Sequence, residues 1–343
     1  MRRLCNTLFV MTETAYASLD GENIVIKDEE RVLGRFPLHL LEGIYLFTYK
    51  GASPSLMGKC AEKNINLVLC SPRGRFLARV CGESNGNVLL RRKQYRYADN
   101  AEESNLIARN FITGKIFNER QVIERMKRDH SDRIDVSRFQ EVSEKLREHM
   151  KMASEANSLE YLRGIEGSSA SLYFSLFDEM ILQNKEDFWF HGRTRRPPLD
   201  RVNALLSYAY MLLSCECTAA LSSVGLDPYV GFMHQDRPGR NSLALDLMEE
   251  LRASMADRFV LSLINNRMVS SECFIEQESG AVLLSDKGKK IFQKEWQERK
   301  QVIIEQPFLK EKIEWGLIPY AQALLVARYL RGDLDGYPPF LWK

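Results

Sequence analysis

The order of hydrophobic and polar positions changes character near residue 80. Before this point, short runs rich in β-branched and aromatic residues alternate with turn residues, which is typical of strands. The predicted strands cover residues 7–11, 15–19, 23–27, 44–48, 66–70 and 75–80. Turn residues at 20–23 and 71–74 predict hairpins, and one apolar face over 55–63 predicts a short helix. This front part is therefore predicted to be a compact, mostly antiparallel β domain.

Beyond residue 86, apolar residues recur every three or four positions, which is the period of an amphipathic helix. Helices are predicted over residues 87–97, 101–128, 136–150, 159–180, 200–224, 243–268, 286–299 and 318–330. A loop is expected over 184–198, and a small hairpin is expected across Gly280. The fold class is therefore α+β: an N-terminal antiparallel β-sandwich-like domain (1–85), a basic linker or helix (86–100) and a larger all-α C-terminal domain (101–343).

Length and composition narrow the class of protein. The chain has 343 residues, of which 45% are hydrophobic and 27% charged, so it can bury two cores of moderate size. It contains no run of 18 apolar residues and no signal sequence with a cleavage site. Its seven cysteines are scattered and show no C-x-x-C spacing, which favours reduced, buried thiols. We therefore expect a cytoplasmic protein with no membrane partner.

The net charge of +2 conceals local concentrations of basic residues. Two clusters stand out: Arg91, Arg92, Lys93 and Arg96, and then Arg193, Arg195 and Arg196. Such clusters favour a polyanion as partner. The alternative interpretation of each cluster is an ordinary solvated surface.

Several common catalytic signatures are missing from the sequence. It has no G-x-G-x-x-G, no G-x-x-x-x-G-K-[ST], no G-x-S-x-G and no H-E-x-x-H. Only five histidines occur, so a histidine-rich site for a transition metal is poorly supported. These absences argue against P-loop, Rossmann, α/β-hydrolase and zincin chemistry.

Residues 231–252 form the first candidate site. His234 lies in a loop closed by Pro238 and Gly239, and Asp246 and Glu249 share one face of the helix that follows. A loop imidazole beside helical carboxylates fits a hard divalent ion, with manganese or magnesium as the candidates. The alternative is that the two acids form surface ion pairs with Arg252 or other basic neighbours.

The second candidate is Glu166, which stands between Gly164 and Gly167 inside a helical pattern. Each glycine costs about 1 kcal/mol relative to alanine in a helix, so the pair suggests close approach of another helix or a ligand. Arg163, one turn earlier, could balance the carboxylate or meet a phosphate. A tight helix crossing with Glu166 at its solvent edge is the alternative.

Four segments carry a family resemblance. They are Leu-Arg-Gly-Ile-Glu-Gly at 162–167, Arg-Pro-Pro-Leu-Asp-Arg-Val-Asn-Ala-Leu-Leu-Ser at 196–207, Gly-Phe-Met-His at 231–234 and Ser-Leu-Ala-Leu-Asp-Leu-Met-Glu-Glu-Leu-Arg at 242–252. In order and spacing this combination resembles the universal CRISPR-associated integrase of spacer acquisition. The strand-rich front is similar to that family's N-terminal domain. The segments 91–96 and 196–200 look most like the variant that accompanies type I-C systems.

The resemblance implies a metal site and a reaction. Glu166, His234 and Glu249 match the family's three catalytic metal ligands, with glutamate at the last position where other members carry aspartate. Asp246 matches a further acidic position beside the metal, and Arg163 and Arg252 are candidate phosphate contacts nearby. The implied cofactor is Mn²⁺ or Mg²⁺. The implied reaction is transesterification, in which the 3′-hydroxyl of a short DNA duplex attacks the CRISPR repeat.

The implied partners are double-stranded DNA, as protospacer and repeat, a second copy of the chain, and a small ferredoxin-like CRISPR-associated protein. The β domain is expected to contribute dimerisation and DNA contacts, and the α domain to be catalytic. Candidate DNA-binding residues are Arg73, Arg75, Arg91, Arg92, Lys93, Arg96, Arg193, Arg195, Arg196 and Arg240. Among the aromatic residues, Tyr161 and Tyr208 fit buried core positions better than base stacking, and Trp189 fits either base stacking or a docking patch.

Two other functions remain open on the sequence. A structure-selective DNA repair nuclease could use the same metal ligands, and would give cleavage fragments without joined products. A DNA-binding scaffold would carry its acids for structural reasons and show no metal-dependent activity.

Overall fold

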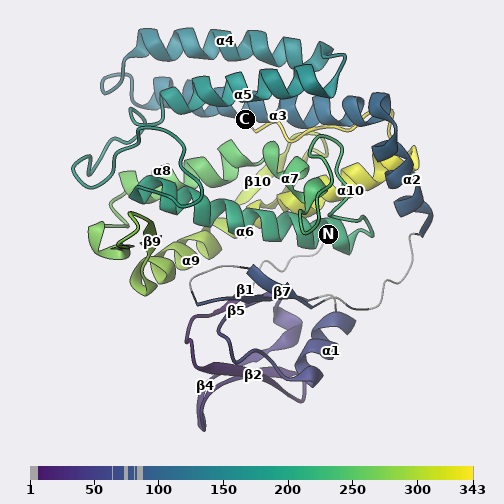
Figure 1. Ribbon diagram of the computed structural model, residues 1–343, viewed down its shortest axis with the longest axis vertical. Coiled ribbons are helices and arrows are strands. Elements are labelled where there is room, and N and C mark those ends of the chain that lie inside the picture. The colour runs from purple at the N-terminus through teal and green to yellow at the C-terminus, as the bar shows by residue number, and fades with distance from the viewer. Residues whose placement is uncertain (1–6, 64, 73–75, 81, 83–87, 343) are drawn as a thin grey trace. The chain divides into compact units, whose positions relative to one another are not determined.

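Two units of structure divide the chain. The computed structural model describes residues 7–63, 65–72, 76–80, 82 and 88–342. The first unit comprises Met1–Gly86, Lys290–Ile303 and Glu314–Leu317, and the second comprises Asn87–Lys289, Ile304–Ile313 and Ile318–Lys343. Figure 1 shows strands in the first and mostly helices in the second, so the α+β prediction is confirmed.

Two sheets make up the first unit. Strands β2 (Ala15–Asp20), β3 (Asn23–Asp28) and β4 (Arg31–Pro37) form an antiparallel sheet, and the second sheet has the order β1 (Thr7–Val10), β5 (Gly43–Phe47), β6 (Asn66–Cys70), β7 (Phe76–Arg79). In the second sheet, β5 pairs in parallel with both β1 and β6, and only β6 and β7 are antiparallel. The expectation of mostly antiparallel pairing is therefore wrong for this sheet.

The parallel pair β5 and β6 has a local cause. Helix α1 (Pro54–Glu62) lies between these strands in the sequence and supplies the crossover that parallel neighbours require. The Ser53 hydroxyl caps it by accepting a hydrogen bond from the Leu56 amide, and Pro54 fits the first turn. Ile24 of β3, Leu46 of β5, Leu67 of β6 and Leu56 of α1 all enter one buried apolar cluster. Both sheets and the helix therefore share a core, as a sandwich-like domain requires.

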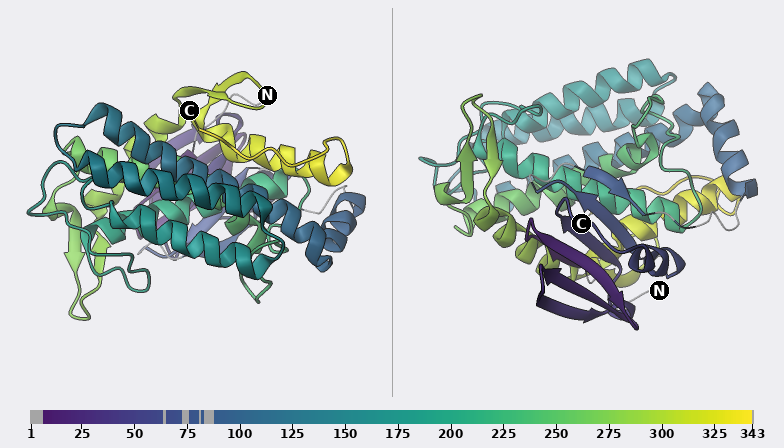
Figure 2. Two further views of the ribbon diagram at one scale, coloured as in Figure 1. Left: turned by 90° about the horizontal axis from the view of Figure 1, so that it is seen from above. Right: turned by 60° about the horizontal axis from the view of Figure 1, so that its bottom comes forward.

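Long helices dominate the second unit. In chain order they are α2 (Val88–Asp99), α3 (Ala101–Asp129), α4 (Val136–Glu155), α5 (Leu159–Ser175), α6 (Arg201–Ser223), α7 (Ser242–Glu249), η2 (Arg252–Asp257), α8 (Arg258–Asn265) and α10 (Ile318–Arg331). Most of α9 (Asp286–Lys300) belongs to the first unit, which includes Lys290–Ile303. Helices α3, α4 and α5 pack side by side as one layer (Figures 1 and 2). Side-chain caps at Asn100, Asp135, Ser158 and Asp200 fix the beginnings of α3 to α6.

The helix predicted over 243–268 is interrupted. Its middle, Arg252–Asp257, is wound as a π-helix between α7 and α8. Such wide turns are rare and are frequent at functional sites. The interruption comes directly after Glu249, so the backbone is irregular beside one of the predicted ligands.

Short strands and the end of the chain complete the second unit. The predicted hairpin is present as β8 (Phe274–Glu276) and β9 (Val282–Leu284), with Gly280 at φ 77° in its turn. A second pair, β10 (Ile303–Gln306) and β11 (Glu311–Glu314), was not predicted, so the stretch from 101 onward is not all-α.

The segment 337–342 is tied down by hydrogen bonds. Asn118 donates to the Phe340 carbonyl (2.7 Å) and accepts from the Trp342 amide (2.8 Å). The Phe340 amide donates to Glu250 (2.9 Å), and a Cβ on Gly114 would lie only 2.8 Å from Pro339. This tail therefore packs into the helical unit beside α3 and the end of α7.

One helix of the described residues, α6, is long and apolar enough to cross a membrane by length and composition. Residues that make up 61% of its most apolar window are buried inside the protein, as in the core helix of a globular domain.

Candidate metal centre

Two of the three predicted ligands, Glu166 and Glu249, meet at one buried cation, the ammonium group of Lys115, and the third, His234, lies beside Glu249. Glu166 projects from α5, Glu249 from the end of α7, and His234 from the loop before α7. Lys115 Nζ on α3 contacts Glu166 Oε1 and lies 2.9 Å from Glu249 Oε2. His234 Nε2 lies 3.9 Å from Glu249 Oε1. The structure thus brings residues that are up to 83 positions apart in the sequence into one site.

Asp246 organises the histidine loop. Its carboxylate accepts hydrogen bonds from the backbone amides of Phe232 (2.6 Å), Met233 (3.0 Å) and His234 (3.0 Å), and it lies 2.6 Å from His234 Nδ1. A Cβ on Gly231 would lie 2.9 Å from this carboxylate and 2.8 Å from Ser242, so only glycine fits there. Because Nδ1 faces Asp246, the ring presents Nε2 toward Glu249, which is the arrangement of a metal-binding histidine held by a carboxylate.

The two accessory arginines are engaged within the protein. Arg163 donates from Nη2 to the Met233 carbonyl (2.6 Å) and so holds the histidine loop from α5. Arg252 Nη2 lies 3.0 Å from Glu249 Oε1, and its guanidinium stacks over the Tyr210 ring at 5.0 Å. Arg252 therefore balances the charge of an adjacent acid, whereas Arg163 holds the backbone of the histidine loop in place.

Burial in this site disfavours the charged forms of the side chains, and close partners of opposite charge offset that effect. Burial would raise the pKa of Glu249, but Arg252, Lys115 and His234 outweigh it and lower that pKa to about 2. Burial would lower the pKa of Lys115, but Glu249, Glu119 and Glu166 raise it above its usual value. Glu249 is therefore a carboxylate and Lys115 an ammonium at neutral pH.

Two further buried acids lie in the same network. Burial raises the pKa of Glu119 on α3 to about 8 and that of Asp257 on η2 to about 6. Tyr210 donates a hydrogen bond of 2.5 Å to Asp257, whereas Glu119 Oε2 has no hydrogen-bond partner among the described residues. An ionisable group without full compensation is costly inside a protein, so its presence there marks a functional region.

Sequence reasoning missed Lys115, Glu119 and Asp257. A signal for the first two was present, because they occupy the apolar face of α3. The buried positions of that face include Phe111, Ile112, Lys115, Ile116, Glu119, Val122 and Ile123. A charged residue at a position that the helical period assigns to the core needs a partner. Asp257 had no such signal, because the π-helix changes the period before it.

The structure contradicts the surface location in the first alternative but not its ion pair. Asp246 and Glu249 are buried, with side chains 0% and 4% exposed, and Glu249 pairs with Arg252 at 3.0 Å. Gly164 and Gly167 mark no tight crossing, since a Cβ on either would meet nothing within 4 Å. The glycines leave open space along α5 on both sides of Glu166, which is 25% exposed.

The donor set fits a hard divalent ion. Carboxylate oxygens and one imidazole are the ligands that Mn²⁺ and Mg²⁺ accept. In the part of the chain that the structure describes, no group of three such donors is arranged to hold a metal ion, and Lys115 pairs with the two carboxylates. A cation centred between these acids, with an oriented imidazole beside them, shows that the pocket is built for positive charge.

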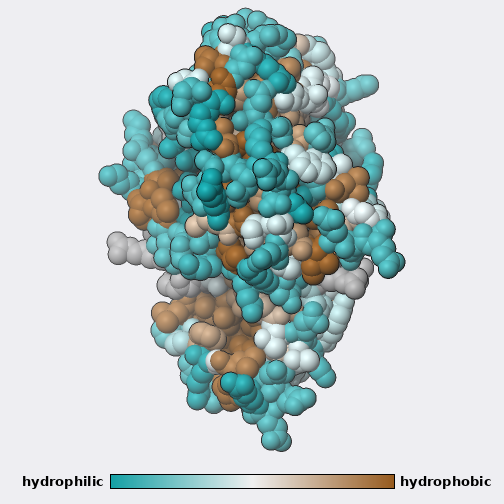
Figure 3. Space-filling view, turned by 90° about the vertical axis from the view of Figure 1, so that its left-hand side faces the viewer, coloured by the Kyte–Doolittle hydropathy of each residue, from teal (hydrophilic) through white to brown (hydrophobic). Residues whose placement is uncertain are grey.

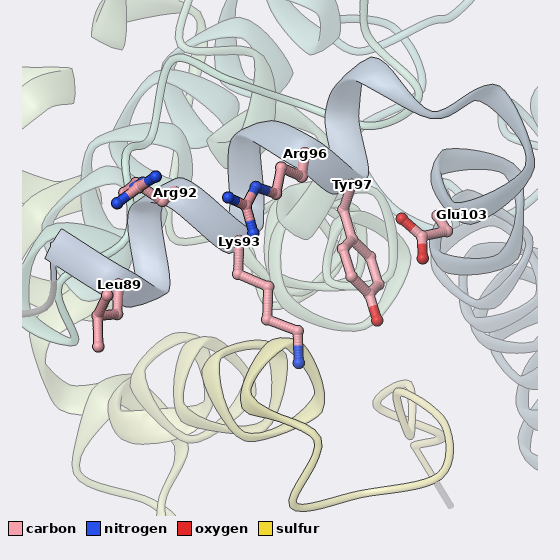
Figure 4. A pocket seen from close by; sticks show the side chains of 6 residues that line it. All are labelled: Leu89, Arg92, Lys93, Arg96, Tyr97 and Glu103. Carbon is pink, nitrogen blue, oxygen red and sulfur yellow. The ribbon is translucent and has the colours of Figure 1, made fainter.

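The basic residues of α2 form a separate surface. A cavity of about 430 Å³ is lined by Leu89, Arg92, Lys93, Arg96, Tyr97 and Glu103. Figure 4 shows Arg92, Lys93, Arg96 and Tyr97 projecting from α2, with Glu103 of α3 beside Tyr97. Three of the four residues of the predicted basic cluster, Arg92, Lys93 and Arg96, therefore line one concave face with a single acid at its edge.

The other predicted DNA-binding residues are scattered. Arg195 and Arg196 are exposed, and Arg240 is half-buried in the loop before α7. Arg193 turns inward, with its guanidinium 5.1 Å from the Tyr210 ring centre and hydrogen-bonded to Asn203, so it is not a surface contact. Arg73 and Arg75 lie outside the described residues.

The aromatic residues give a mixed result. Tyr208 is buried, as expected. Tyr161 is 48% exposed, so the core assignment is wrong for it. Trp189 is 43% exposed and stacks on His191 at 4.8 Å. Both exposed rings are therefore open to a partner.

Comparison with known proteins identifies the family. The family model described as CRISPR associated protein Cas1 matches residues 8–298. The chain belongs to the Cas1 family. This Cas1 protein is 46% identical to a CRISPR-associated endonuclease Cas1 of Chlorobaculum tepidum over 343 residues, which cover 100% of both chains. The predicted family is confirmed, and the name of this relative supports a CRISPR-associated nuclease. The narrower type I-C assignment stays a prediction.

Solved structures share the fold of this Cas1 protein. A casposase bound to integration product matches with a TM-score of 0.81 and 23% identity, covering 100% of this chain and 95% of the other. A Cas6-RT-Cas1–Cas2 complex matches with a TM-score of 0.81 and 22% identity, covering 98% of this chain and 36% of the other. At these identities the likeness concerns the fold.

Proposed function

We propose that this Cas1 protein is a divalent-metal-dependent DNA integrase that inserts short DNA fragments into a CRISPR array. The observation that carries the proposal is that Glu166 and Glu249 share one buried cation while the His234 imidazole lies 3.9 Å from Glu249. Family membership supports the reaction class, since its relatives are named CRISPR-associated endonucleases.

Each residue of the site has a proposed task. Glu166, Glu249 and His234 hold the ion, and Asp246 orients the imidazole through Nδ1. Arg252 and Lys115 keep Glu249 ionised. A bound Mn²⁺ or Mg²⁺ would supply Lewis acidity toward a phosphodiester.

In the reaction, a DNA 3′-oxygen bonds to a phosphorus of the repeat, its proton is released, and the bond from that phosphorus to the bridging 3′-oxygen breaks, leaving a new 3′-hydroxyl. No protein nucleophile is needed.

DNA contacts and partners follow from surfaces outside the site. We assign phosphate contacts to the α2 cavity with Arg92, Lys93 and Arg96, because clustered cations on one concave face bind a polyanion through released counter-ions. Arg91 on the same helix and the exposed Arg195 and Arg196 extend this assignment. We propose a cytoplasmic location, where the DNA substrates are.

The protein partners are a second copy and a small ferredoxin-like CRISPR-associated protein. A complex of Cas1 with Cas2 is among the structures that share the fold, which supports an assembly of this kind. For the second copy, β4 exposes Val32 (55%), Leu33 (42%) and Phe36 (39%) in the first unit. Figure 3 shows hydrophobic side chains gathered on one face of that unit. Apolar surface of this kind favours a protein interface.

The test is an integration assay with the full-length protein. A labelled protospacer duplex is incubated with a supercoiled plasmid that carries a CRISPR array, with and without the small partner, in Mn²⁺, Mg²⁺ or EDTA. We expect label joined covalently to the plasmid only with metal, and a loss of at least about 100-fold in Glu249→Gln, because a lost ligand weakens both metal binding and charge stabilisation.

Glu148→Gln, an exposed acid on α4, is the control that should integrate normally. Cleavage fragments without joined product would contradict the integrase and favour a structure-selective repair nuclease. No metal-dependent product under any condition would leave the DNA-binding scaffold.

A further inference from the structure

The ammonium group of Lys115 pairs with the same two carboxylates that would bind the proposed metal ion. Its side chain is 5% exposed, and its ammonium contacts Glu166 and lies 2.9 Å from Glu249 Oε2. An ion ligated by these carboxylates at about 2.1 Å would then lie within about 5 Å of the ammonium. Two cations this close in a buried site repel each other strongly. The ammonium and a divalent ion are therefore alternatives for the same pair of acids.

A second acceptor for the ammonium lies one turn along the same helix. Glu119 is four residues after Lys115 on α3, so both side chains project from one face. Glu119 is buried, at 2% exposure, and its Oε2 has no hydrogen-bond partner among the described residues. A lysine has a long flexible stem with several rotatable bonds, so its ammonium can move without backbone motion.

We infer that Lys115 is an internal counter-ion that competes with the divalent metal, neutralising Glu166 and Glu249 in the metal-free protein and moving to Glu119 when metal binds. This inference rests on the proposed metal site and adds a regulation to it. The two carboxylates are never left unpaired, which avoids the cost of uncompensated buried charge. The metal must displace a partner, so its affinity is lower than the donor set alone would give.

The inference predicts opposite effects for two substitutions of the same residue. Lys115→Met removes the charge but keeps an unbranched side chain, so Mn²⁺ should bind about tenfold more tightly than in the wild type, within the usual range of coupled sites. Lys115→Arg keeps a cation whose planar fork grips carboxylates more firmly, so Mn²⁺ should bind more weakly. A residue that merely supports the fold would weaken binding in both variants.

Glu119 supplies an independent check. When the ammonium arrives, Glu119 must give up its proton to become its anionic partner. A glutamine cannot do so, so in Glu119→Gln Mn²⁺ should bind more weakly than in the wild type. The same substitution in the Lys115→Met background should leave Mn²⁺ affinity unchanged, since no ammonium remains to be accepted. This double-mutant cycle isolates the coupling between the two side chains.

The experiment is isothermal titration of Mn²⁺ into the full-length proteins, with thermal unfolding in EDTA and in Mn²⁺ as a second readout. Lys127→Met is the matched control, because Lys127 is also on α3 but pairs with Glu124 at 3.1 Å, and its Mn²⁺ affinity should be unchanged. Glu249→Gln should abolish the binding and so identify the site being titrated. In EDTA, Lys115→Met should unfold at a lower temperature than the wild type, and Mn²⁺ should raise its midpoint by more.

The outcomes separate this inference from the metal site itself. Mn²⁺ binding that is tighter in Lys115→Met and weaker in Lys115→Arg supports the counter-ion. If the wild type binds Mn²⁺ and Lys115→Met binds it with equal or lower affinity, the counter-ion role of Lys115 is overturned and the metal site is not. If Lys115→Met does not fold, Lys115→Arg and Glu119→Gln decide, and unchanged or tighter binding in both overturns the inference. No Mn²⁺ binding by the wild type or by Lys115→Met overturns both proposals.

Discussion

The two N-terminal sheets and the helical unit bury very different side chains. In the described residues up to Gly82, the buried polar side chains are Thr48 and Ser71, and none of those buried is charged. The helical unit buries Lys115, Glu119, Asp246, Glu249, Glu250 and Asp257, each at most 4% exposed. One core is thus apolar, while the other contains an ionic network between its helices.

The difference shows what each core contributes. An apolar core gives stability in proportion to the surface that it removes from water. Buried ions contribute little net stability, since their desolvation offsets their attraction, so their presence indicates chemistry that needs them. The N-terminal sheets are therefore a scaffold by their core composition, and the site chemistry lies in the helical unit.

The largest effect should come from damage to the apolar core. Leu46 of β5 is 0% exposed, and Leu46→Ala should cost about 2–5 kcal/mol of unfolding free energy through lost contacts and a cavity. Urea unfolding followed by circular dichroism measures this change. Leu40→Ala, at a 42% exposed position of the same N-terminal part, is the control and should unfold like the wild type.

Mn²⁺ affinity of the folded Leu46→Ala protein should equal that of the wild type. A matching fall in Mn²⁺ affinity would contradict the division between scaffold and site.

A smaller effect, seen through pH, should come from Glu250. Burial raises its pKa from 4.5 to about 7, although Tyr337, Gln322 and the Phe340 amide all donate to its carboxylate. The folded state therefore holds a proton that the unfolded state releases above about pH 4.5, so stability falls as pH rises toward 7. The full change is roughly 3 kcal/mol at about 1.4 kcal/mol per pKa unit.

Glu250→Gln should reduce the slope of unfolding free energy against pH between 5 and 7, measured by urea unfolding at several pH values. The slope should not vanish, because the raised pKa values of Glu119 (about 8) and Asp257 (about 6) act in the same direction. Glu249 does not oppose this trend in that window, because its lowered pKa of about 2 places its titration below pH 5. Glu148→Gln serves as the exposed control. A pH slope equal to that of the wild type in Glu250→Gln would show that this acid is ionised in the folded protein.

The smallest effect should come from the helical surface. Lys145 and Glu141 form an exposed ion pair on α4, one turn apart. Water and salt screen such pairs, so Lys145→Ala should leave the thermal midpoint unchanged within measurement error. A clear drop in that midpoint, abolished by high salt, would mean that surface charges also stabilise this unit.

Much of the fold was predictable because its signals are local. The helical period located α3, α6 and α10, and turn residues located the hairpin across Gly280. The parallel pairing of β1, β5 and β6 was not predictable in this way, since strand partners depend on contacts far apart in the sequence. Strand β4 was missed because its residues are mostly exposed on both faces.

For the site, the ligand residues were proposed before the structure, but their surroundings were not. The motifs around Glu166, His234 and Glu249 carry a family pattern within short segments. Lys115 belongs to a helix about 50 residues before Glu166, and no local pattern connects the two. Likewise, the contact of the tail with Glu250 depends on packing between distant parts of the chain.

The π-helix at Arg252–Asp257 has a consequence for insertions and deletions. A π-turn is an α-helix with one residue added, and removing one residue restores the regular winding. Each residue of an α-helix turns the chain by about 100°. A deletion of one codon in this segment would therefore rotate Asp257 and all of α8 relative to Glu249, with no side chain replaced by another. Natural selection should therefore remove single-residue deletions in this segment, whereas single-residue deletions in the exposed loop over 235–239 should be tolerated.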